Sequence, residues 1–183
     1  MSDRILRAQI SRLATPGAGH ARLAPLVGLW DTTTRLFGDP GARPIETDGS
    51  VEKAWVLGGR FIREDLAGVG EDDEPFLGIG FLGYDNVHHT YQSVWMSSGS
   101  TAFVIGTGTI DSAGKVITLI GDEADAAGRA ARRFRATLTI ESADRHVLAQ
   151  WFVDAHGVMR PAFEISYVRS ADEGSVRVDG SAL

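Results

Sequence analysis

Lys53 and Glu64 stand at equal distances on either side of the adjacent glycines Gly58 and Gly59. A Gly-Gly turn suits a type I′ hairpin, because both of its central residues need a positive φ. In the register that this turn sets, Lys53 lies directly opposite Glu64. An ammonium paired with a carboxylate inside a protein can anchor a polar group of a ligand, and the carboxylate can also act as a general acid or base. The pair is therefore the first candidate for chemistry in this chain.

The same hairpin has one mostly apolar face and one charged face. Glu52, Arg63 and Asp65 lie on the charged face. The face that carries Lys53 and Glu64 is otherwise apolar and consists of Val51, Trp55, Ile62 and Leu66. A buried charge is costly unless it is paired, and on this face each charge has a partner. We therefore expect the face with Lys53 and Glu64 to point inward, with Trp55 as part of an interior wall.

Short β-rich segments separated by turn residues occupy most of the chain. They cover residues 26–36, 47–57, 60–67, 76–84, 90–97, 101–110, 115–121, 131–140, 145–153 and 158–169. The turns between them are too short for crossover helices, so the pattern predicts an antiparallel sandwich or barrel. Ahead of these segments, Ser2 and Asp3 can cap a short helix with Ile5, Leu6, Ile10 and Leu13 on one face.

Length and composition bound the organisation of the chain. With 183 residues we expect an N-terminal helix and linker (1–25), a barrel (26–170) and a polar C-terminal tail (171–183). The net charge of −6 and the lack of a basic run disfavour nucleic acid as a partner. The absence of cysteine excludes disulfides and thiolate metal sites. No apolar run approaches the roughly 18 residues of a membrane span, and no signal peptide is evident, so we expect a cytoplasmic protein.

Three motifs contain residues that often bind cofactors, but the sequence around each of them argues against a cofactor site. Gly78 to Gly83, GIGFLG, matches a dinucleotide-binding pattern, but a turn and another β-rich segment follow it instead of a helix. His88 and His89 are neighbours that point to opposite sides of a strand, so they cannot readily hold one metal ion. His146 and His156 are interpreted as surface or loop residues. We therefore predict neither a metal nor a cofactor, although a single histidine that binds haem stays open.

The segment 90–97 can supply a wall of a binding cavity. Tyr91, Ser93 and Trp95 share one face, and large rings with a few polar groups suit such a wall. We predict that this face points inward. An alternative interpretation stays open, in which Trp95 belongs to an ordinary core and Ser93 only fills space.

The last three strands allow two registers that exclude one another. The turn DAHG pairs Leu148 with Phe163, so that Gln150 and His146 point inward. The turn ESAD pairs Phe134 with Trp151, which turns the opposite face inward together with Glu164. A bulge or a slip of one residue reverses either choice. Gln150 and Glu164 are therefore alternative candidates for the cavity.

Several stretches resemble a known family. Gly28-Leu29-Trp30 in LVGLWD is similar to the G-x-W motif of lipocalin and calycin barrels, in which an arginine of the last strand packs across the tryptophan; Arg169 in ISYVR is the matching residue. WVLGGRFIRED, GIGFLGYDN, YQSVWMSSGST and FEISYVR closely resemble the bacterial domain of unknown function 1579. The resemblance spans about residues 26–169. It implies an all-β, antiparallel lipocalin-like barrel of about ten strands with a short N-terminal helix, and it carries no activity.

The leading hypothesis is a protein that binds a small hydrophobic molecule inside the barrel. Trp55, Tyr91 and Trp95 would form walls, and Lys53 with Glu64 would anchor a carboxylate or hydroxyl of the ligand. One alternative is an isomerase or cyclase with Glu64 as its acid or base, and another is a haem-binding barrel. Whether the protein is an enzyme stays open. We also expect a homodimer and no interaction with membranes.

Overall fold

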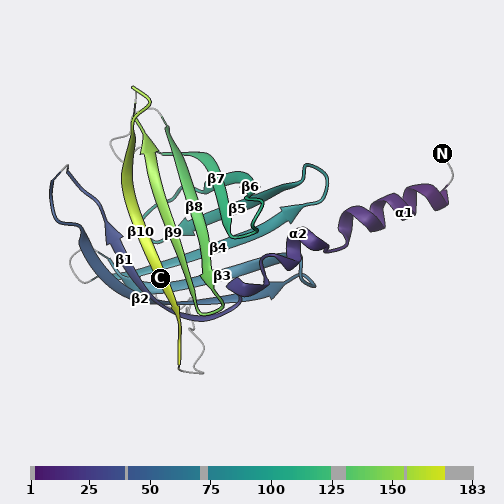
Figure 1. The fold of residues 1–183 in the computed structure, drawn as a ribbon, viewed down its shortest axis with the longest axis horizontal. Coiled ribbons are helices and arrows are strands. Elements are labelled where there is room, and N and C mark those ends of the chain that lie inside the picture. Colours follow the sequence, from purple (N-terminus) through teal and green to yellow (C-terminus); the bar gives the residue numbers. More distant parts are fainter. Residues whose placement is uncertain (1–2, 40, 71–73, 125–130, 155, 172–183) are drawn as a thin grey trace.

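The computed structural model describes residues 3–39, 41–70, 74–124, 131–154 and 156–171. Within them, antiparallel strands close into a ten-stranded barrel in the order β1-β10-β9-β8-β7-β6-β5-β4-β3-β2 (Figure 1). The strands are β1 (Gly28–Leu36), β2 (Ile45–Val56), β3 (Phe61–Val69), β4 (Pro75–Asp85), β5 (Thr90–Ser97), β6 (Val104–Ile110), β7 (Val116–Glu123), β8 (Arg132–Ser142), β9 (Arg145–Val153) and β10 (Met159–Arg169). The predicted all-β barrel is confirmed, and residues 172–183 of the predicted tail lie outside the described residues.

Sequence neighbours pair with one another around most of the barrel, because their turns are too short for anything but hairpins. Only β1 and β10, the first and last strands, pair across the whole length of the chain and close the barrel. Each β-rich segment predicted from the sequence overlaps one of these strands. In Figure 1, β8, β9 and β10 cross β2, β3 and β4 steeply, as expected for strongly tilted strands.

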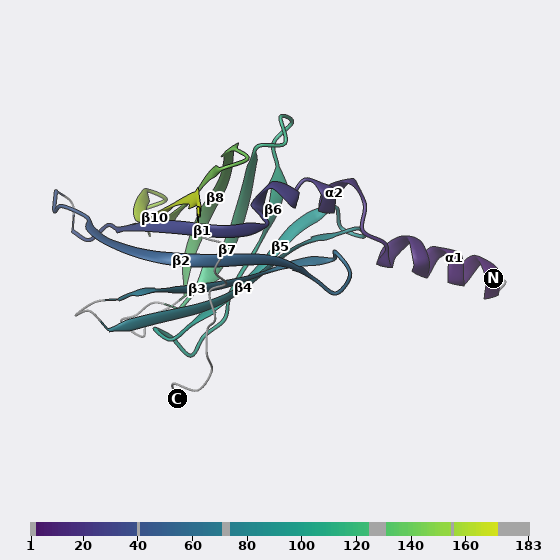
Figure 2. The ribbon, with the colours of Figure 1, turned by 90° about the horizontal axis from the view of Figure 1, so that it is seen from below.

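The chain before the barrel forms three helical segments. The predicted helix is α1 (Asp3–Ala14), which projects away from the barrel in both views (Figures 1 and 2). Two short segments were not anticipated from the sequence, α2 (Ala18–Ala21) and the 3-10 helix η1 (Ala24–Leu26). Leu23 and Leu26 are fully buried. Tyr91 donates a hydrogen bond from its hydroxyl to the Gly19 carbonyl at 3.1 Å, so this segment closes one end of the barrel.

Two apolar clusters fill the interior. One joins Leu23 and Leu26 to side chains of β3 and β5–β8, including Ile62, Tyr91 and Phe134. The other is built on β1, β2, β3 and β10 and consists of Trp30, Val51, Leu66, Ile165 and Tyr167. Leu148 packs against both clusters. The functional groups described below lie beside the second cluster. No helix in the described part of the chain is long and apolar enough to span a membrane.

Two irregularities resolve the conflict between the last three strands. The register shifts between Ile140 and Ser142 in the β8–β9 pair and between Pro161 and Phe163 in the β9–β10 pair. Phe134 consequently pairs with Phe152 rather than with Trp151, and Leu148 pairs with Ile165 rather than with Phe163. Both predicted pairings were therefore wrong in detail. The inner face of β9 is the one that the DAHG register indicated, with His146, Leu148, Gln150 and Phe152.

Candidate functional site

The β2–β3 hairpin has the predicted register, with Lys53 opposite Glu64 and Val56 opposite Phe61. The turn itself differs from a two-residue type I′ turn. Leu57, Gly58 and Gly59 all have positive φ values of 49°, 66° and 81°, and the amides of Gly59 and Arg60 both donate to the Val56 carbonyl. Val51, Lys53, Ile62 and Leu66 are buried, which confirms that their face points into the barrel.

Lys53 lies in the interior with three partners around its ammonium. The Nζ atom is 3.0 Å from Nε2 of His146 and 3.4 Å from Oε2 of Glu64, and it lies 3.9 Å from the centre of the Tyr167 ring. The side chain is only 4% exposed. Burial lowers the pKa of Lys53, while the charge of Glu64 and its hydrogen bond act in the opposite direction. The ammonium is thus satisfied entirely by the protein.

His146 is held between aromatic rings on the inner face of β9. Its ring stacks on Tyr167 with centroids 4.2 Å apart and meets the edge of Trp30 at the same distance. Burial, followed by the charges of Lys53 and Arg169, lowers the pKa of His146 to about 2, so the imidazole is neutral. An ammonium can only donate hydrogen bonds, so Nε2 accepts from Lys53 and the ring proton sits on Nδ1. The buried Nδ1 has no hydrogen-bond partner among the described residues.

Glu64 is the accessible member of the network. Its Oε1 accepts a hydrogen bond of 3.2 Å from the hydroxyl of Tyr167, and its Oε2 faces Lys53. Burial and the nearby carboxylate raise the pKa of Tyr167 well above its ordinary value, so the phenol remains a donor. The side chain of Glu64 is 22% exposed, against 4% for Lys53. Anything that enters the barrel therefore meets the carboxylate before the ammonium.

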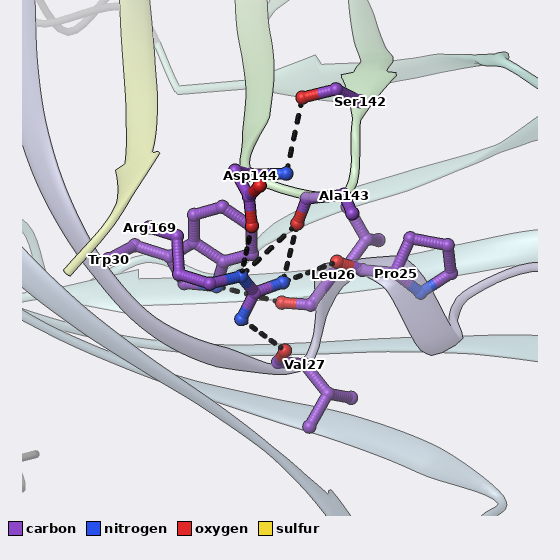
Figure 3. A network of polar contacts seen from close by, with 8 residues as sticks. All are labelled: Pro25, Leu26, Val27, Trp30, Ser142, Ala143, Asp144 and Arg169. Carbon is purple, nitrogen blue, oxygen red and sulfur yellow. Dashed lines mark hydrogen bonds and ion pairs between the residues drawn. The ribbon is translucent and has the colours of Figure 1, made fainter. Parts of the chain in front are cut away.

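A second polar arrangement closes the barrel behind His146. The Arg169 guanidinium lies 4.3 Å from the centre of the Trp30 ring, as the family resemblance implied, and donates to the backbone carbonyls of Val27 and Ala143 and to the Asp144 carboxylate (Figure 3). The Trp30 indole donates to the Leu26 carbonyl at 2.9 Å. These contacts tie β1 and β10 to the segment that closes this end. They fix Trp30, one of the two rings against which His146 packs.

The predicted aromatic walls differ in where they lie. Trp55 is half-buried and packs against the first apolar cluster. Tyr91 is 1% exposed and its hydroxyl is used by Gly19, so it belongs to the core of the closed end and is not an open cavity wall. Ser93 and Trp95 lie on the inner face of β5 and are half-buried.

Trp95 shares a cross-strand row with the charged pair. The register places Lys53, Glu64, Gly80 and Trp95 next to one another on β2, β3, β4 and β5. Gly78 and Gly80 make room for the Trp95 ring. A Cβ at Gly78 would overlap the indole, and one at Gly80 would lie 3.0 Å from it. The glycines of GIGFLG therefore admit a large ring rather than a phosphate.

Only one of the two alternative candidates points inward. Gln150 is buried and donates a 3.0 Å hydrogen bond to Glu123. Glu164 lies opposite Ala149 on the outer face of β10, 36% exposed, with Arg35 at 3.8 Å. The prediction that Glu164 faces the cavity is wrong, because it came from the ESAD register, which the irregularity between Ile140 and Ser142 displaces by one residue.

Sequence reasoning missed His146 and Tyr167 as members of the site. His146 was interpreted as a surface or loop residue, yet it is 1% exposed. The DAHG register did turn it inward, and that was the only signal that could have found it. Nothing in the sequence distinguishes Tyr167 from the other aromatic residues of the strands, because its partners Glu64 and His146 are far from it in the chain. His88 is bound to Asp85 in an exposed turn. Groups of three or more metal-ligating side chains are absent from the described residues.

A separate groove lies on the outer surface, away from this network. It has a volume of about 350 Å³ and is lined by Asp31, Thr32, Thr33, Asp48, Gly49, Ser166 and Val168. Asp31, Thr33, Asp48 and Val168 are exposed and alternate along their strands with less exposed residues, which places the groove outside the barrel.

Comparison with known proteins identifies a family and a fold. The family model described as protein of unknown function (DUF1579) matches residues 15–169. The crystal structure of Rv2717c from M. tuberculosis is similar with a TM-score of 0.63 and 18% identity, over 85% of this chain and 99% of that one. A de novo designed fluorescence-activating β-barrel aligns with a TM-score of 0.43 and 17% identity, over 79% of this chain and 93% of that one. No curated protein matches this chain.

Proposed function

The chain belongs to the DUF1579 family of proteins of unknown function, and we propose that it binds a small, largely apolar molecule inside its barrel next to Glu64. The observation that carries this proposal is the charged network within an apolar interior, of which only the Glu64 carboxylate is open to solvent. Charges are buried at a cost, and charged groups held in protein interiors cluster at functional sites.

The surroundings of Glu64 support an apolar ligand. Trp95, Phe76 and Phe163 face the interior beside the second cluster, and all three are half-buried rather than sealed. Aromatic walls with one or two polar groups are typical of sites for small organic molecules. Ser93 lies two residues before Trp95 on β5, on the same inner face, so a larger side chain there would compete with a ligand.

The experiment is a titration with Nile red, a neutral dye whose emission rises in apolar surroundings. We expect the wild-type protein to bind it, Ser93→Phe to weaken binding at least tenfold, and Gln92→Phe, on the outer face of the same strand, to leave it unchanged. Val168→Trp, which fills the outer groove, should also have no effect. Loss of binding in Val168→Trp with retention in Ser93→Phe would move the ligand to the outer groove and refute the proposal.

A second candidate function is proton abstraction from such a molecule by Glu64. The Glu64 carboxylate accepts from Tyr167 and faces Lys53, and its remaining oxygen lone pairs could accept a proton from a bound molecule. Glu64→Gln would abolish turnover of a candidate substrate while leaving Nile red binding intact. Retained turnover in that variant would exclude this role. The homodimer and the cytoplasmic location expected from the sequence stay predictions, and sedimentation equilibrium would test the first.

A further inference from the structure

Within the charged network, the side chain that a ligand can reach is the acceptor Glu64 and not the donor Lys53. Lys53 directs its ammonium at Glu64, at His146 and at the Tyr167 ring, which occupies its three donors. At 4% exposure it offers no surface to an incoming group. A ligand carboxylate cannot form an ion pair with Lys53 unless the network first comes apart.

Glu64 has capacity left for a ligand. Each carboxylate oxygen has two lone pairs, and the protein uses one on each, for Tyr167 and for Lys53. The side chain is 22% exposed, so Glu64 can meet a ligand from the solvent side. A carboxylate accepts hydrogen bonds and repels a second anion. The accessible end of the network is therefore suited to a donor.

The row beside Glu64 adds a feature that favours a cation. Gly80 lies between Glu64 and Trp95, and a Cβ built on it would lie 3.5 Å from Cβ of Glu64 and 3.0 Å from the indole. The lack of a side chain at Gly80 leaves room for the Trp95 indole in the same cross-strand row as Glu64. An indole in this row can add cation–π attraction to the charge attraction between Glu64 and an ammonium group.

We propose that the ligand presents a hydrogen-bond donor to Glu64, and that an apolar molecule with a protonated amine binds more tightly than the same molecule with a carboxylate. This inference rests on the proposed function and narrows its ligand. It reverses part of the expectation from the sequence, in which Lys53 and Glu64 would anchor a carboxylate or a hydroxyl. The hydroxyl stays compatible with the site, because it too can donate to Glu64.

The test measures displacement of Nile red by three ligands of equal chain length, dodecylamine, 1-dodecanol and dodecanoate, at pH 7.5. The wild-type protein should bind dodecylamine at least tenfold more tightly than dodecanoate, with 1-dodecanol between them. Glu64→Gln should reduce this preference to less than about threefold. Glu52→Gln changes the net charge equally but lies on the outer face of β2, and it should keep the preference.

Glu64→Gln leaves Lys53 without its counterion, so Lys53→Met/Glu64→Gln serves as a second variant in which both charges are absent. It should bind 1-dodecanol as the wild type does and lack the amine preference. The inference would be overturned, and the proposed function would stand, if the wild type bound dodecanoate as tightly as dodecylamine or more tightly. An unchanged preference for the amine in both Glu64 variants would have the same meaning. Failure of all three ligands and of Nile red to bind the folded wild type would overturn the proposed function itself.

Discussion

His146 should make the stability of this protein sensitive to mild acid. Its pKa is lowered to about 2 in the folded protein, against 6.5 for an ordinary histidine. Below pH 6.5 His146 is protonated in the unfolded chain but stays neutral in the folded protein. The free energy of unfolding therefore falls as the pH falls. Each pH unit in this window costs about 1.4 kcal/mol, and lowering the pH from 7.5 to 5.0 should therefore cost about 2 kcal/mol. Most carboxylates stay ionised over that range.

The assay is urea unfolding at the two pH values. A loss of about 2 kcal/mol corresponds to a decrease of about 1 M in the urea midpoint at a typical slope for a chain of this size. His146→Gln removes the titration while its amide oxygen can still accept from Lys53, so this variant should lose markedly less stability between pH 7.5 and 5.0. His156→Gln, at an exposed position, should behave as the wild type. An equal loss in His146→Gln and wild type would show that the imidazole is not held neutral inside the barrel.

Three further changes test the fold around the site. Leu57 has a φ of 49° and is 71% exposed, so Leu57→Gly should relieve backbone strain and raise the free energy of unfolding by about 0.5–1 kcal/mol in urea melts. Gly78→Ala places a methyl group against the Trp95 ring and should lower stability by about 1–3 kcal/mol and shift the tryptophan emission; Gly68→Ala, with ordinary contact distances, should do neither. Deletion of residues 3–14 should change Tm by less than about 2 °C in a thermal melt, because the described apolar side chains of α1 are exposed.

The β2–β3 hairpin shows what the sequence can predict in this protein. Its turn is short and contains adjacent glycines, so the register had few alternatives. The choice of face then followed from the alternation of apolar residues with charges, since a slip by one residue would have buried Glu52, Arg63 and Asp65. Lys53 and Glu64 could be paired and turned inward for these reasons alone.

The other half of the network shows where such reasoning fails. His146 and Tyr167 come together across β9 and β10, and each of the two neighbouring hairpins contains an extra residue. A bulge reverses the alternation without a change in turn length, so counting back from DAHG and ESAD gave two incompatible faces. The contact between Lys53 and His146 also joins residues far apart in the chain, which no local pattern encodes.

A purely structural role for the ion pair explains less than a binding role. Buried polar pairs can fix the register of neighbouring elements. Here the register of β2 and β3 is already fixed by the turn at Gly58 and Gly59 and by the apolar residues around the pair. A pair kept only for register has no need of an opening to solvent, whereas the Glu64 side chain is 22% exposed. Tyr167 and Lys53 instead contact the two oxygens of one carboxylate at the accessible end of the network, and His146 holds Lys53 in place, which is the arrangement that recognition of a donor requires.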